Sequence, residues 1–220
     1  FHDTEVEMHF TPVKLKYPWR DRRLQKWFEG FRIEDFQDLN GFKVAPVEMN
    51  VVFILLHIFK HLFNEGIGLR QVMDYYFVLK TLSTSTSSAQ AKSPLKGEGC
   101  EIENGSEWFG EAKKVISDLG LDKFAAAMMH VMHEVFGLQR EQMLCEPDEK
   151  LGRMILEDIM QRGNFGHGDD RTKKDEGIVK RFLRTTSLSM KYLPHFPMEV
   201  LWQPWYRLTQ RIWMIRNGYK

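Results

Sequence analysis

Carboxylates alternate with other residues at the start of the chain. Asp3, Glu5, Glu7 and His9 fall on one face of a predicted strand over residues 3–10. Carboxylates two residues apart on a strand point to the same side, and hard oxygen ligands of this kind suit Mg²⁺. A divalent ion can stabilise an in-line displacement at a nucleoside triphosphate. The alternative is a solvated strand face, and the pattern alone favours that alternative.

A second candidate site is a cluster of cations on a predicted helix over residues 46–63. His57 and His61 are four residues apart and therefore share a face, with Lys60 beside them. Zinc proteases use this histidine spacing but need a glutamate next to the first histidine, where this chain has Ile58. The cluster therefore fits either cations that face phosphates or the polar edge of a buried helix.

Two further pairs have helical spacing. Arg70 and Asp74, on a predicted helix over residues 69–82, are expected to form an ion pair across one turn. His130 and His133 lie three residues apart in a methionine-rich segment, where a place at the core edge is expected. A zinc hydrolase built on the histidine pairs is the rival interpretation, and metal analysis would test it.

The C-terminal part of the chain is basic. Between Arg171 and Lys220, eleven lysines and arginines stand against three acids, although the formal net charge of the whole chain is only +1. Trp202, Trp205 and Trp213 interleave with arginines, which suits contact with nucleic acid or a membrane surface. The alternative is a terminal helix that packs its tryptophans on the protein and turns its arginines outward.

The elements that must position these residues are mostly helices. Besides the two helices named above, apolar spacing and turn residues predict helices over 21–31, from 106 to Gly120, over 122–136 and over 146–162. A last helical stretch is expected to be broken at Pro194, Pro197 and Pro204, and a second short strand is expected over 42–47. The fold class is therefore mainly α, with about seven helices attached to a strand remnant of an α/β domain. We expect residues 1–45 to be that remnant and residues 46–220 to be a helical domain, with a mobile loop over 83–105.

The amino-acid composition restricts the class of protein. The chain has 220 residues, of which 43% are hydrophobic and 28% charged, as in an ordinary globular protein. The two cysteines, Cys100 and Cys145, suggest no disulfide framework, so a cytoplasmic location is expected. No apolar run approaches the ~20 residues of a membrane helix.

Several segments together resemble a known family. VEMHF at 6–10, the stretch Leu55–Leu79, GNFG at 163–166 and the tail around FPMEVLWQPWYRL are similar to the uncharacterised nucleotidyltransferase family of the polymerase-beta-like superfamily. The resemblance implies transfer of a nucleoside monophosphate from an NTP to an unknown acceptor with Mg²⁺. Glu7 would be the third catalytic carboxylate and a metal ligand. His57, Lys60, His61 and Arg70 would line the cleft against phosphates or acceptor, and Asp74 would orient Arg70.

The chain departs from the family pattern in one respect. The family's Gly-Ser turn followed by Asp-x-Asp has no counterpart in these residues. Because the chain opens at Phe1 directly on a strand pattern, we expect a truncated domain whose sheet partners stand upstream, and a chain that is inactive alone. The rival hypothesis is a non-catalytic helical module that recognises an acceptor, a protein or a nucleic acid through a cleft or the basic tail.

Overall fold

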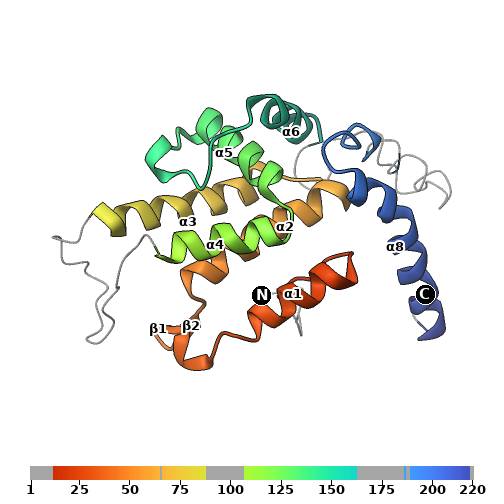
Figure 1. The fold of residues 1–220 in the computed structure, drawn as a ribbon, viewed down its shortest axis with the longest axis horizontal. Helices are drawn as coiled ribbons and strands as arrows, with labels where there is room; N and C mark the ends of the chain where they lie inside the picture. The colour runs from red at the N-terminus through yellow and green to blue at the C-terminus, as the bar shows by residue number, and fades with distance from the viewer. Residues whose placement is uncertain (1–11, 65, 88–106, 163–185, 187–188, 219–220) are drawn as a thin grey trace, which may run out of the picture.

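The computed structural model describes residues 12–64, 66–87, 107–162, 186 and 189–218. Its secondary structure in this part is mainly helical, which confirms the predicted fold class (Figure 1). The strand predicted over residues 3–10 lies outside the described residues. The α-helices are α1 Pro18–Phe28, α2 Val47–Asn64, α3 Leu69–Ser87, α4 Glu107–Asp118, α5 Asp122–Phe136, α6 Glu149–Arg162 and α8 Pro197–Arg216. Two 3₁₀ turns, Ile33–Asp35 and Arg140–Gln142, and two strands, β1 Gln37–Leu39 and β2 Phe42–Val44, complete the described elements.

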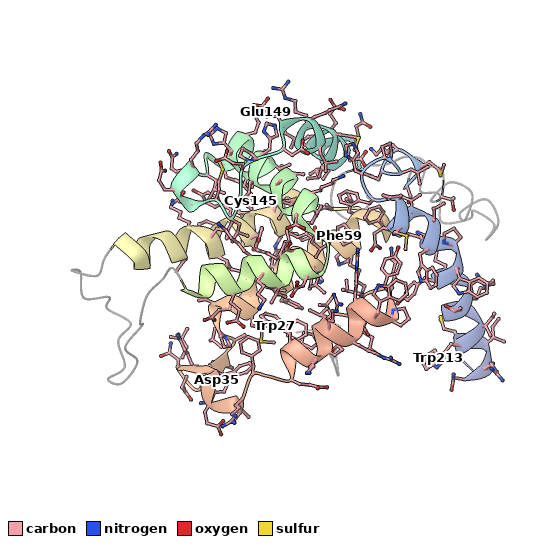
Figure 2. All side chains as sticks on the ribbon, in the orientation of Figure 1. Trp27, Asp35, Phe59, Cys145, Glu149 and Trp213 are labelled. Atoms are coloured by element: carbon pink, nitrogen blue, oxygen red, sulfur yellow. The ribbon has the colours of Figure 1, made fainter. Side chains whose placement is uncertain are left out.

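Helix α2 occupies the centre of the bundle. It packs against α3 and α4, while α5 packs against α3 and α6. The ring of Phe59, which is labelled in Figure 2, lies 4.9 Å from that of Phe124 and 5.5 Å from that of Phe196, measured between centroids. Phe59 therefore connects α2 with α5 and with the start of α8. The strongly apolar sequence of α2 explains its central position, because a helix that is hydrophobic on most sides must be covered on most sides. The fully buried residues of α2 include Val51, Val52, Leu55, Leu56 and Ile58.

The only sheet in the described residues is a small hairpin. Strand β1 pairs antiparallel with β2, with Leu39 opposite Phe42. Asn40 and Gly41 form the turn, with φ angles of 53° and 84°. Both values match a type I′ turn, for which Asn-Gly is the preferred sequence. We predicted a strand over 42–47; it ends at Val44, and β1 was not predicted, although Asn-Gly was the signal for it.

Some helix boundaries differ from the prediction. Helix α1 begins three residues earlier, at Pro18, since proline suits the first turn of a helix. Helix α3 continues to Ser87, so the predicted loop over 83–105 is wrong for its first residues; the rest of it, from residue 88, lies outside the described residues. Asp148 receives the backbone N–H of Leu151 at 3.0 Å and so caps α6, at the predicted opening.

Pro204 lies inside α8 instead of ending it, which corrects our prediction. A proline in a helix removes one backbone hydrogen bond and crowds the preceding turn. Packing offsets that loss here, because Gln203 is 2% exposed and donates a hydrogen bond to the carbonyl of Phe63 at the end of α2. Arg207 donates to the same carbonyl at 3.2 Å. Contacts with α2 on both sides of Pro204 thus hold α8 in place.

The segment before α1 belongs to the same core as α2. Val13, Leu24 and Phe28 are part of one buried apolar cluster with the α2 residues. The indole N–H of Trp202 donates to the carbonyl of Lys16 at 3.1 Å, which fastens the segment to α8. The predicted division of the chain at residue 45 stays a prediction.

Candidate functional site on helix α2

The histidines of α2 lie side by side on its half-buried face. Their Nε2 atoms are 3.1 Å apart, and their ring centroids are separated by 4.5 Å in an edge-to-face arrangement. Phe53 precedes them along the same face, with its ring 5.8 Å from that of His57. The spacing of four residues explains the contact. A hydrogen bond at this distance requires that one ring donates and the other accepts, and the tautomers of the two rings decide which.

Lys60 is exposed and lies on a different side of α2, toward Lys16. Only a cavity of about 10 Å³ lies among Lys16, Lys60, Phe63 and their neighbours. A volume this small holds no more than about one water molecule. The region around Lys60 is therefore a packed junction in this structure, and any phosphate bound there would lie on its surface.

Lys16 is a charged residue of this region that no sequence pattern singled out. Its side chain is 8% exposed. The ammonium donates to Oε1 of Gln203 at 2.8 Å, lies 3.9 Å from the carboxylate of Glu199, and sits 5.1 Å from the ring centre of Phe63. Burial lowers the pKa of Lys16 to about 8, and the charges of Arg207 and Lys60 act in the same direction, whereas Glu199 opposes them.

Glu199 completes this junction. Burial raises the pKa of its carboxyl group, and the charges of Lys16 and Arg20 oppose the rise. The Arg20 guanidinium lies 3.9 Å from the carboxylate. Lys16, Arg20 and Glu199 together form a partly desolvated ion cluster between the segment before α1, α1 itself and α8. The cluster therefore fastens the described segment before α1 to α8.

Arg70 and Asp74 lie on the exposed face of α3. Among the described residues, no ion pair joins these two side chains, so the expected pair across one turn is not formed. No described hydrogen bond links either of them to His57 or His61. Exposed pairs of this spacing contribute only about 0.3–0.5 kcal/mol, which is too little to impose one side-chain geometry.

Glu7, Asp3 and Glu5 lie outside the described residues. Within the described ranges, no group of three or more His, Cys, Asp or Glu side chains is placed to hold a metal ion. The histidine pair of α2 offers nitrogens, whereas Mg²⁺ prefers oxygen. The described residues therefore do not fit a magnesium site by themselves, and Glu7 is the ligand that the family resemblance implies.

The other histidine pair is structural. His130 is 5% exposed, and its Cδ2 atom would lie 2.6 Å from a β-carbon added at Gly152 of α6. His133 points elsewhere, with Nδ1 2.8 Å from the carbonyl oxygen of Leu138. The two imidazoles thus serve helix packing and a helix end. This arrangement agrees with the expected place at the core edge.

The comparison with known families bears on this part of the molecule. Residues 1–93 match the family model of an uncharacterised nucleotidyltransferase. The resemblance drawn from the sequence is therefore confirmed for this region, which is nucleotidyltransferase-like. The matched range contains Glu7, the histidine pair, Lys60, Arg70 and Asp74. No curated protein and no solved structure matches the chain.

None of the helices in the described part of the chain combines the length and the apolar character that crossing a bilayer requires.

Proposed function

We propose that the protein transfers a nucleoside monophosphate from an NTP to an acceptor, using Mg²⁺, at a surface centred on α2. The observation that carries the proposal is the contact between His57 and His61 within the matched range. In such a transfer the acceptor attacks the α-phosphorus, and the bond to the β-phosphate oxygen breaks, so that pyrophosphate leaves. Bound Mg²⁺ would neutralise charge on the triphosphate and leaving group.

The residues of α2 and α3 would bind and orient the substrates. Of His57 and His61, one would donate a hydrogen bond to a phosphate or acceptor oxygen from the half-buried face of α2, because the other uses its N–H in the contact between the two rings. Lys60 and Arg70 are both exposed and would add positive charge at the rim, with Asp74 beside Arg70. Glu7 would be a ligand of Mg²⁺. We further propose that the protein works in the cytoplasm, where a free thiol such as that of Cys145 stays reduced.

The first experiment measures NTP binding. The purified chain is titrated with a fluorescent ATP analogue in Mg²⁺, and the His57→Gln/His61→Gln variant should bind it about tenfold more weakly. His133→Gln is the matched control, because His133 is an exposed histidine on a different helix, and its affinity should stay within about twofold of the wild type. If the wild type binds no NTP, or if the double variant binds as well as the control, the α2 surface is not the binding site.

The second experiment follows the transferred group. With the intact protein, ATP labelled at the α-phosphate should pass its label to an acceptor in a cell extract, whereas the γ-label should leave in pyrophosphate. Transfer of the γ-label instead would indicate a kinase and overturn the proposal. Glu7→Gln should remove the effect of Mg²⁺ on NTP affinity, and Glu134→Gln, an exposed glutamate on α5, should preserve it.

A second candidate function is partner recognition without chemistry. The exposed arginines and tryptophans of α8 favour it: Trp205 is 57% exposed and Trp213 56%, so the expectation that the tryptophans pack inward is met only by Trp202. For a nucleic-acid partner, retention of a single-stranded RNA oligonucleotide should fall with salt and fall further in Arg211→Ala/Arg216→Ala. Absence of retention at low salt would exclude that partner class.

A further inference from the structure

Helix α8 carries an apolar stripe that is exposed in the described part of the structure. Successive members of the stripe are three and four residues apart in alternation, as at the a and d positions of a coiled coil. Their exposed fractions lie between 47% and 68%. The residues that pack α8 onto the bundle, Glu199, Val200 and Gln203, lie on another face. The α8 stripe consists of Met198, Leu201, Trp205, Leu208, Ile212 and Ile215.

The second half of α8 is exposed to solvent in the described part of the chain. Every residue from 211 to 218 is exposed, and Figures 1 and 2 show this end of α8, with Trp213 on it, apart from the other labelled helices. Isolated helices shorter than about 12–15 residues are marginal in water, since their stability comes mainly from packing of an apolar face. A contiguous exposed stripe of large apolar side chains also indicates an interaction surface.

The charges beside the stripe indicate what kind of helix would cover it. Arg211 and Arg216 are exposed and lie on either side of the α8 stripe. These are the e and g positions of a coiled coil, whose charges face those of the partner helix. From Val200 to the end of the chain there is no Asp or Glu. In a pair of α8 helices from two copies, the flanking charges would all be positive and would repel each other. A helix with carboxylates beside its apolar seam would instead complement both arginines.

We propose that the α8 stripe docks an acidic amphipathic helix of another protein, with carboxylates placed against Arg211 and Arg216. The docked helix would cover Leu208 and Ile212 in the middle of the exposed half. This proposal specifies the partner class for the second candidate function, and it does not depend on nucleotidyl transfer. NTP binding at α2 can therefore fail or succeed without affecting it.

The test uses the full chain and two synthetic helical peptides of about three heptads. Both have leucine and isoleucine at the seam; one carries glutamate and the other lysine at the flanking positions. Fluorescence anisotropy should show the glutamate peptide binding about tenfold more tightly than the lysine peptide. In Arg211→Glu/Arg216→Glu the preference should reverse. Arg22→Glu/Arg23→Glu, which changes two exposed arginines on α1, should keep the original preference.

A second variant separates docking from folding. Leu208→Ser/Ile212→Ser should lose binding of the glutamate peptide, while its thermal transition stays within a few degrees of the wild type because both side chains are exposed. Three outcomes would overturn the proposal. The first is binding of neither peptide, or of both equally. The second is a dimer that light scattering detects in the wild type but not in Leu208→Ser/Ile212→Ser. That result would mean that a second copy of the chain covers the α8 stripe. The third is a wild-type chain that binds anionic vesicles but not the glutamate peptide, with vesicle binding lost in Leu208→Ser/Ile212→Ser.

Discussion

The burial of Lys16 has a measurable consequence for the pH dependence of stability. Desolvation lowers its pKa from 10.5 in the unfolded chain to about 8 in the folded protein. Between these values the unfolded chain binds more protons than the folded protein, so the free energy of unfolding rises with pH. Below about pH 8 both states are protonated and the contribution is flat.

The magnitude follows from the two pKa values. At pH 9 the folded lysine is mostly neutral while the unfolded one is still charged, which corresponds to about 1 kcal/mol more stability than at pH 7. Cys145 acts in the opposite direction, because burial raises the pKa of its thiol, and the native state then keeps a proton that the unfolded state releases. A reference variant is therefore needed to isolate Lys16.

The assay is urea unfolding of the wild type and of Lys16→Met/Glu199→Gln at a series of pH values from about 7 to about 9. The double variant removes both charges, so no unpaired ion is left buried. From about pH 7 to about pH 9, the unfolding free energy of the wild type should rise by about 1 kcal/mol relative to that of the variant. The burial argument would be refuted if the difference in unfolding free energy did not change with pH, or if the variant became more stable relative to the wild type as pH rises. In Glu199→Gln alone, loss of the opposing carboxylate should move the rise to lower pH.

Three further substitutions test two contacts between packed segments and the conformation of the hairpin turn. Tyr192→Phe removes the hydrogen bond that the phenol donates at 2.6 Å to the buried carboxylate of Asp158, and should cost about 1–3 kcal/mol of unfolding free energy in urea titrations. Gly152→Ala should destabilise by about 1–3 kcal/mol, since its β-carbon would lie 2.6 Å from His130; a stabilised variant would contradict the packing of α5 on α6. Asn40→Ala should cost about 1 kcal/mol at a φ of 53°, whereas Asn40→Gly should be nearly neutral in the same thermal-unfolding comparison.

The sequence by itself determined the features that depend on neighbours along one helix or turn. The contact between His57 and His61 follows from their spacing of four residues, because that spacing brings side chains together on any α-helix. The end of α5 at Gly137 was predictable for a similar reason, since a left-handed φ of 69° suits glycine. The apolar sequence of α2 predicted a buried helix. The resembling segments at 6–10 and 55–79 predicted the family match over residues 1–93, whereas those at 163–166 and in the tail lie outside it.

Only the tertiary structure decided which charges are buried and which apolar side chains are not. Lys16 reads as one more lysine among several, and it becomes a desolvated ion because Glu199 and Gln203, far along the chain, fold against it. Trp202 and Trp205 are three residues apart on one helix, yet Trp202 bonds to the carbonyl of Lys16 while Trp205 is exposed. Helical periodicity fixes the angle between two side chains, but the packing of other segments fixes which direction is inward.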